Sequence, residues 1–156
     1  MRNQKGFSLI ELLIVVTIIG IVAAIAIPNL IASRRAAHEA SAQVSVRTIF
    51  TGQVTYQATL GLGTFASDLT TLSNARIIDS SLGSGSKSGY TFAIVEQAGT
   101  GQSAVFGCYG VPAITTWPAA TGTRRFGLTE AGVLRGDSTI GTTPNTRTLI
   151  TGMTNL

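Results

Sequence analysis

The chain has 156 residues, of which 44% are hydrophobic and only 12% are charged, and its formal net charge at pH 7 is +4. This length leaves room for one domain of ordinary size. The basic residues stand singly or in pairs, such as Arg34-Arg35 and Arg124-Arg125. That pattern argues against a nucleic-acid-binding protein, for which a basic run or stripe is typical.

The N-terminal stretch joins a short basic leader to a long apolar run. Met1 to Lys5 is polar and basic, and the run from Leu12 to Ser33 contains no charged residue. As a helix rising 1.5 Å per residue, this run covers about 33 Å, against about 30 Å for the hydrocarbon core of a bilayer. Glu11 stands at the edge of the run. An ionisable group there is costly to bury, which makes it a candidate functional residue.

Three interpretations of this stretch compete. The first is a secretory signal, which has a basic start and a cleavage site of small residues, and residues 22–26 could supply that site. Against it, Pro28 follows closely and Glu11 interrupts the apolar region. A plain membrane anchor explains the length but not Glu11. The third interpretation is processing on the cytoplasmic side, with a cut between Gly6 and Phe7.

The residues from Lys5 to Leu12 (Lys-Gly-Phe-Ser-Leu-Ile-Glu-Leu) resemble the cleavage and methylation signature of bacterial type IV prepilins and type II secretion pseudopilins. Glycine precedes the cut, phenylalanine follows it, and Glu11 is the fifth residue of the mature chain. The resemblance covers residues 1 to about 30. It implies an inner-membrane prepilin peptidase that cuts after Gly6 and methylates the new amino group of Phe7. It also implies polymerisation into a helical filament through the N-terminal helices.

Elementary electrostatics gives Glu11 a role in such a filament. A cut before Phe7 creates an ammonium group, and in the filament core each Glu11 can meet the Phe7 amine of a neighbouring subunit. An unpaired charge in a medium of low dielectric constant is strongly penalised, so pairing favours the correct register over a slipped one.

Two residues predict weak points in the apolar helix. Gly20 is a poor helix former, and Pro28 removes one backbone hydrogen bond and clashes with the preceding turn. We expect a kink at Pro28. The resemblance adds that many pilins curve or unwind between such positions when they are packed in the filament.

Beyond Pro28 the apolar residues recur at spacings of three and four, which predicts a continuous helix to about Leu60, ended by Gly61 and Gly63. The predicted fold class is α+β, a pilin fold in which the second half of the helix packs on a small antiparallel β-sheet head. The predicted divisions are a leader at 1–6, a hydrophobic transmembrane and polymerisation helix at 7–33, its amphipathic second half at 34–62, and a globular head at 63–156.

Within the head, the pattern predicts short elements. Ser67 is expected to cap a helical turn over residues 68–72, and an extended piece is expected at 75–79. Residues 83–89 are expected to form a loop. The β-rich runs at 90–95 and 104–109 predict a hairpin closed by residues 99–101, and a second hairpin is predicted from 125–129 and 133–135. Leu149 and Ile150 are compatible with a last edge strand or a surface loop.

The head shows no pattern typical of a catalytic, cofactor or metal site. His38 is the only histidine and lies on a polar helix face, and the single cysteine, Cys108, is expected to be a small buried side chain that makes no internal disulfide. The acidic residues are scattered, and neither Asp79 nor Asp137 belongs to a tight acidic loop of the kind that binds calcium. We therefore predict no enzyme, no cofactor and no metal.

The sequence thus predicts the structural subunit of an extracellular type IV pilus, a homopolymer that supports adhesion, twitching motility or DNA uptake. Before assembly the chain would be a single-pass inner-membrane protein with a cytoplasmic N-terminus, drawn out by an assembly platform and an assembly ATPase. Contacts of the fibre with surfaces or DNA stay open. The rival interpretations are a type II secretion pseudopilin and a membrane-anchored exported binding protein or enzyme.

Overall fold

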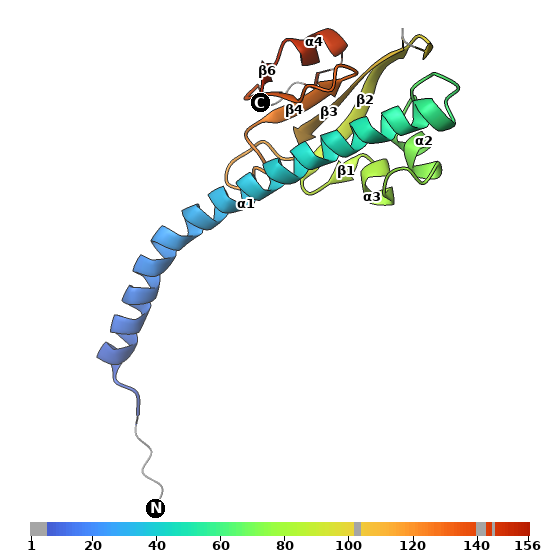
Figure 1. Cartoon of the computed structure of the whole chain (residues 1–156). Coiled ribbons are helices and arrows are strands. Elements are labelled where there is room, and N and C mark those ends of the chain that lie inside the picture. The colour runs from blue at the N-terminus through green and yellow to red at the C-terminus, as the bar shows by residue number, and fades with distance from the viewer. Residues whose placement is uncertain (1–5, 102–103, 140–142, 145) are drawn as a thin grey trace, which may run out of the picture. The chain divides into compact units, whose positions relative to one another are not determined.

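The computed structural model describes residues 6–101, 104–139, 143–144 and 146–156, with no account of the side chains of residues 96 and 97. Figure 1 gives the order of the elements along the chain. The predicted leader, residues 1–6, lies outside the described residues except for Gly6. The chain divides into two compact units, Met1–Arg34 and Arg35–Leu156.

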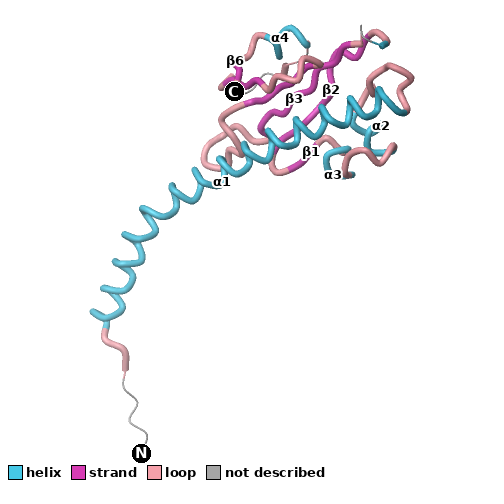
Figure 2. Tube along the Cα trace, in the orientation of Figure 1, coloured by secondary structure: helices cyan, strands magenta, loops and turns pink. Residues whose placement is uncertain are grey.

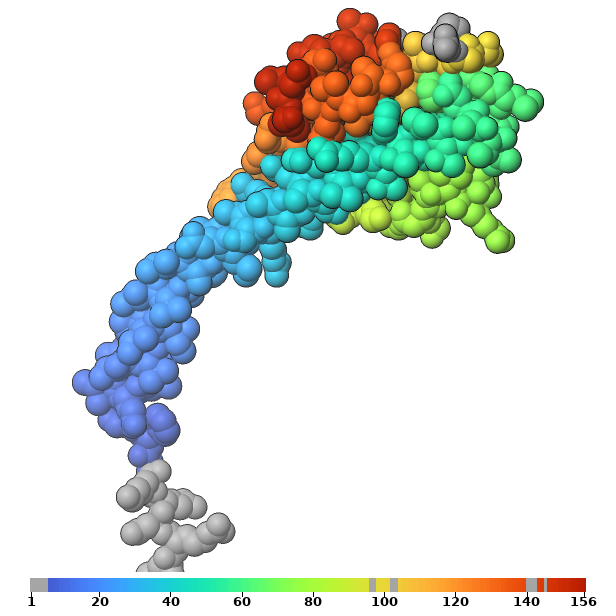
Figure 3. Space-filling view, in the orientation of Figure 1, coloured from blue at the N-terminus to red at the C-terminus, as the bar shows by residue number. Residues whose placement is uncertain are grey.

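Helix α1 (Leu9–Thr59) belongs to both units and ends one residue before the predicted Leu60. The amides of Leu60 and Gly61 both donate to the carbonyl of Tyr56, at 2.9 and 2.7 Å, which closes the last turn. In the second unit α1 lies along the face turned to the viewer in Figure 3. Its buried residues there recur at spacings of three and four, as expected for a helix with one face on a core: Ala42, Ser45, Val46, Ile49, Gly52 and Gln53.

The second unit contains a six-stranded sheet whose strands follow one another in chain order, each antiparallel to the next. Figure 2 shows this sheet beside α1. The predicted α+β class, with a long N-terminal helix and a small antiparallel sheet, is confirmed. The strands are β1 (Ser86–Lys87), β2 (Tyr90–Ala98), β3 (Val105–Pro112), β4 (Arg125–Thr129), β5 (Arg135–Asp137) and β6 (Thr154–Asn155).

Two strand glycines leave room for side chains that pack on the sheet, one from a neighbouring strand and one from a helix. A Cβ atom added to Gly110 of β3 would lie 2.6 Å from the Phe92 ring and 3.5 Å from a methyl of Val46 on α1. A Cβ atom added to Gly127 of β4 would lie 2.7 Å from Ile150 of α4 (Arg147–Thr151). Glycine is needed at both places because any side chain would push the packed neighbour away.

Two predictions for residues 67–79 are wrong. Asp68, and not Ser67, caps α2 (Leu69–Asn74), because its Oδ1 accepts from the amide of Thr71 at 2.7 Å. That hydrogen bond lowers the pKa of the Asp68 carboxyl. No strand forms at 75–79: Ala75 keeps a helical conformation as the C-cap of α2, and α3 (Ser80–Gly83) follows.

The loop predicted at 83–89 contains a small hairpin instead. Ser86 pairs with Thr91 and Lys87 with Tyr90, so β1 and β2 are joined by Ser88 and Gly89 alone. Both residues have positive φ, 50° and 74°. A two-residue turn of this kind matches the twist of antiparallel strands, which is why the polar stretch can pair.

The predicted second hairpin and edge strand also need correction. β5 begins at Arg135, because the connection after β4 stays irregular through Val133 and Leu134. Leu149 and Ile150 form part of α4 and not a strand, since the Thr146 hydroxyl accepts from the amide of Leu149 and Ile150 is fully buried against the sheet. The edge strand is β6.

The core of the second unit is rich in aromatic rings. The Phe106 ring on β3 has its centroid 4.5 Å from that of Phe65 and 6.0 Å from that of Phe50 on α1. Tyr90 and Phe126 stack at 6.0 Å, and the Tyr90 hydroxyl donates to the carbonyl of Arg124 at 2.8 Å. These contacts fix α1 and the loop after it on the sheet.

Gln53 on α1 is a fully buried polar residue that the sequence analysis did not single out. Its Nε2 donates to the carbonyl of Ala66 at 2.9 Å, and its Oε1 accepts from the amide of Ala66 at 2.7 Å. One side chain therefore satisfies both backbone groups of a buried residue in the chain segment that follows α1.

We predict that Gln53→Leu lowers the free energy of unfolding by about 2–6 kcal/mol, because it leaves a buried donor and a buried acceptor without partners, at about 1–3 kcal/mol each. Denaturant unfolding of the purified full chain measures the effect. Gln43→Leu, on the same helix but only half-buried, is the matched control and should change stability far less. Equal effects of the two substitutions would contradict the role assigned to Gln53.

Candidate functional site

The predicted processing site lies just before α1. Gly6, Phe7 and Ser8 precede the first helical residue, and the amide of Leu12 donates to the carbonyl of Ser8 at 3.3 Å. The Phe7 side chain is 79% exposed. Glu11 is exposed in the first turn of α1, and no salt bridge among the described residues includes it. A carboxylate at this end of a helix is stabilised by the helix dipole.

The first half of α1 exposes its apolar side chains. An apolar window of this helix is long and hydrophobic enough to cross a membrane, and none of that window is buried inside the protein. Large exposed side chains follow one another on all sides, among them Leu9, Ile10, Leu12, Ile18, Ile19, Ile25 and Leu30. So large an apolar surface requires cover by lipid or protein.

The predicted weak points, Gly20 and Pro28, both lie inside α1, which is assigned as helix through both residues. Proline has no backbone N–H and so cannot donate to the carbonyl four residues earlier. Nearby, the Ser33 hydroxyl donates to the carbonyl of Asn29 at 2.9 Å. A serine within an apolar helix commonly finds a hydrogen-bond acceptor for its hydroxyl in this way. A kink at Pro28 stays a prediction.

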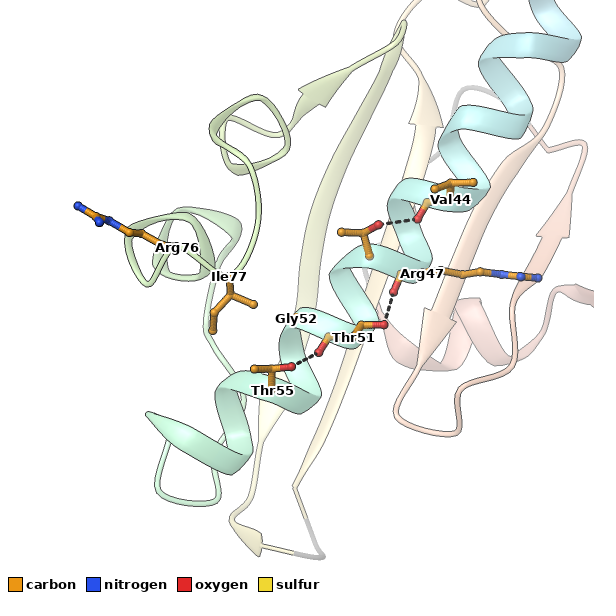
Figure 4. Close-up of a pocket in the computed structure, with 8 residues that line it drawn as sticks. Val44, Arg47, Thr51, Gly52, Thr55, Arg76 and Ile77 are labelled. Atoms are coloured by element: carbon orange, nitrogen blue, oxygen red, sulfur yellow. Dashed lines mark hydrogen bonds between the residues drawn. The ribbon is translucent and has the colours of Figure 1, made fainter.

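A groove of about 560 Å³ lies along α1 in the second unit, between the helix and the segment that carries Arg76 and Ile77. Figure 4 shows Arg47 and Arg76 pointing away from it in opposite directions. The hydroxyls of Thr48, Thr51 and Thr55 donate to carbonyls one turn earlier on α1. The groove therefore offers apolar contact and no converging set of catalytic groups among the residues that line it.

The carboxylates of the head that the sequence analysis considered for calcium are engaged by cations. Asp79 accepts from Lys87 at 3.2 Å, and Asp137 accepts from Arg125 at 2.7 and 2.8 Å. Among the described residues, no three His, Cys, Asp or Glu side chains lie close enough to hold a metal ion. Cys108 is fully buried in the core, and burial raises the pKa of its thiol to about 12. His38 is half-buried on α1.

The Arg125–Asp137 pair joins β4 to β5 and makes stability depend on pH. Hydrogen bonds from Arg125 lower the pKa of the Asp137 carboxyl, and the amide of Thr139 donates to the same group at 2.9 Å. A carboxyl whose pKa is lowered on folding stabilises the protein fully above its unfolded pKa of about 4 and loses that contribution as the pH falls through the folded value.

We predict that Asp137→Asn lowers the free energy of unfolding by about 1–3 kcal/mol at pH 7, the usual value of hydrogen bonds to a charged group. The difference from the unsubstituted chain should shrink below about pH 4. Unfolding curves measured across the acid range test this. Asp79→Asn breaks an exposed pair of the same kind and should cost at most about 1 kcal/mol. A deficit for Asp137→Asn that stays constant down to pH 2 would contradict the assignment.

Comparison with known proteins finds a family at the N-terminus and relatives that match over short segments. Residues 1–27 match the family described as the prokaryotic N-terminal methylation motif. The chain is 64% identical over 39 residues to the Type IV wide pilus major component PilA4 of Thermus thermophilus, a segment that covers 25% of this chain and 30% of that protein. The comparisons support a type IV pilin.

Two further relatives also match over short segments. The Type IV major pilin protein PilA of Myxococcus xanthus is 46% identical over 54 residues, which cover 35% of this chain and 24% of that protein. A fimbrial protein of Pseudomonas aeruginosa is 79% identical over 29 residues, 19% of each chain. The matches thus span less than a third of each pilin. No solved structure matches the chain.

Proposed function

We propose that this chain is the structural subunit of an extracellular type IV pilus, cut after Gly6 and methylated at the amino group of Phe7. The observation that carries the proposal is the methylation motif over residues 1–27, placed on a helix whose apolar window has no cover in the single chain. Cleavage before Phe7 would leave a mature chain that begins with an exposed aromatic residue directly before this helix.

The same helix serves two environments in turn. Before assembly, lipid covers the apolar side chains, and the precursor is a single-pass inner-membrane protein with a cytoplasmic N-terminus. In the filament, the helices of neighbouring subunits replace the lipid. The hydrophobic effect does not distinguish lipid from an apolar protein surface. The pairing of Glu11 with the Phe7 amine of a neighbour then favours the filament and sets its register.

The proposal names the machinery that such a subunit requires. A prepilin peptidase in the inner membrane cuts the leader and methylates the new N-terminus, and an assembly platform driven by an ATPase extracts the subunit. The role of the chain itself is structural, since its relatives are pilus and fimbrial components. The resulting homopolymer would serve adhesion, twitching motility or DNA uptake, and its head would face surfaces or DNA.

The decisive experiment shears cells that make this protein, collects the extracellular fibres and determines the N-terminus of the fibre protein by mass spectrometry. We expect a chain that starts at N-methylated Phe7. The unsheared cell pellet, with its membrane fraction, is the control for precursor that still carries residues 1–6. A protein that starts at Met1 and stays in membranes, or one cut within residues 22–27, would overturn the proposal.

A further inference from the structure

The tryptophan of this chain lies at the end of the apolar run. Trp117 is the only tryptophan in the sequence, and the Arg35 guanidinium lies 4.4 Å from the centroid of its ring. Arg35 comes two residues after Ser33, where the uncharged run ends. Chain connectivity therefore keeps Trp117 close to the level at which the proposed span leaves the hydrocarbon.

The loop that carries Trp117 is held by hydrogen bonds within the loop and by hydrogen bonds to α1. The amide of Ile114 donates to the Thr121 hydroxyl at 3.2 Å, and the amide of Thr121 donates to the carbonyl of Ile114 at 2.9 Å. One helical turn after Arg35, the Glu39 carboxylate accepts from the amide and hydroxyl of Thr123, at 2.7 and 2.8 Å. Figure 3 shows light-orange atoms of this loop beside α1. The loop is thus formed before any partner binds.

The outer surface of this loop is apolar and uncovered. Residues 113–119 are all exposed, with Trp117 at 65% and Ile114 at 44%. The arginine stacks on one side of the Trp117 ring, so the exposed part of the ring stays available for a partner. A tryptophan with an exposed apolar body and a polar N–H is the residue most typical of a membrane–water interface.

The charge beside the tryptophan is positive and lacks a paired anion. Among the described residues, no ion pair includes Arg34 or Arg35. The Nε and Nη2 atoms of Arg35 are buried without a hydrogen-bond partner, and the guanidinium stacks on the Trp117 ring. Glu39 is the nearby carboxylate on α1, and Thr123 occupies one of its oxygens. Arg124 follows Thr123 and adds further positive charge.

We propose that these residues form a lipid-binding patch, which we define as Arg35, Ile114 and Trp117, and that its partner is the anionic phospholipid headgroup of the leaflet where the span ends. Trp117 and Ile114 lie at the headgroup level, and the charge of Arg35 attracts lipid phosphate. The inference rests on the proposed membrane-anchored precursor. The patch would seat the head on the membrane surface before the subunit is extracted.

Lipid is favoured over a second copy of the chain by the composition and place of the patch. Arg35 comes two residues after the span, so the bilayer that holds the span lies within reach of its charge in every precursor molecule. A neighbouring subunit would need a free acidic surface to match this arginine. Among the described carboxylates of the second unit, Asp79, Glu130 and Asp137 are paired with cations, and Glu39 and Asp68 accept hydrogen bonds from Thr123 and Thr71.

The test uses Trp117 as the intrinsic fluorophore of the full chain, reconstituted in vesicles of phosphatidylcholine with and without phosphatidylglycerol. Lipids brominated near the headgroup quench a tryptophan at the interface, lipids brominated deep in the acyl chains quench one in the middle of the span, and acrylamide quenches one in water. Two double variants supply reporters at other places: Trp117→Phe with Val22→Trp in the span, and Trp117→Phe with Val54→Trp on α1. Val54 lies about 28 Å along the helix from Arg35.

We expect brominated lipid to quench Trp117 several-fold more than the Val54→Trp reporter, and more strongly when phosphatidylglycerol is present. Arg35→Gln should weaken the quenching and remove its dependence on phosphatidylglycerol. Arg47 is an exposed arginine farther along the same helix. Arg47→Gln is therefore the matched control and should leave both the quenching and its dependence on phosphatidylglycerol unchanged.

Each other outcome overturns the inference in a distinguishable way. If the Val22→Trp reporter is quenched by lipid while Trp117 is as open to acrylamide as the Val54→Trp reporter, the patch is wrong and the membrane anchor stands. If the Val22→Trp reporter escapes lipid quenching, the anchor and the patch both fail. Protection of Trp117 that rises with protein density, equally in both lipids, assigns the patch to a second copy of the chain.

Discussion

Replacement of Glu11 by leucine is expected to abolish or strongly impair filament assembly while leaving membrane insertion intact. Glu11 is exposed in the first turn of α1 and has no salt-bridge partner among the described residues. In the proposed filament core, its loss leaves the Phe7 ammonium of a neighbour buried without a counter-charge. Removal of one partner of a buried pair costs about 3–5 kcal/mol, and each subunit added to the fibre bears that cost.

The measurement compares fibre protein in the sheared fraction with precursor and mature chain in the membrane fraction. Glu11→Gln keeps the size of the side chain and removes its charge, so it should fail like leucine, whereas Glu11→Asp should retain partial assembly. Thr17→Val is the matched control on the same helix, since the Thr17 hydroxyl bonds only within its own turn, to the carbonyl of Leu13. Normal fibres from Glu11→Leu would show that the charge does not direct assembly.

Replacement of Phe106 by alanine is expected to lower the free energy of unfolding of the head by about 3–5 kcal/mol, the usual cost of such a cavity. The ring is fully buried and lies between Phe50 of α1 and Phe65 of the following segment. Its removal therefore deprives α1, the segment after it and the sheet of a shared contact. For a domain of marginal stability, this loss is a large share of the total.

Denaturant unfolding of the purified full chain measures the loss. Leu62→Ala removes a side chain that is 94% exposed and should stay within about 0.5 kcal/mol of the unsubstituted chain. Phe106→Leu retains most of the apolar volume and should fall between the two. An effect of Phe106→Ala no larger than that of Leu62→Ala would mean that the ring does not hold the three elements together.

Segments with a strong local pattern were predictable from the sequence. The helix from the apolar run to residue 59 follows from its apolar spacing, and β2, β3 and β4 follow from runs of β-branched and aromatic residues. The short elements were not predictable in the same way. Ser67 and Asp68 are both favourable N-cap residues, and only the folded geometry selects Asp68. The run that contains Leu149 and Ile150 is compatible with a strand, but these residues form helix α4, and Gly127 on the sheet leaves room for the Ile150 side chain.

The sequence by itself determined the N-terminal motif and the apolar run that follows it. Gly6, Phe7 and Glu11 are neighbours along the chain, and the length of the apolar run is a property of consecutive residues, so no folding is needed to recognise either. Contacts between distant residues were decided by the tertiary structure alone. Gln53 reaches Ala66, Arg125 reaches Asp137, and Arg35 reaches Trp117 only because the sheet and α1 bring them together. No local sequence pattern encodes such pairs, because the stabilising free energy comes from burial and pairing between residues that are distant in the sequence.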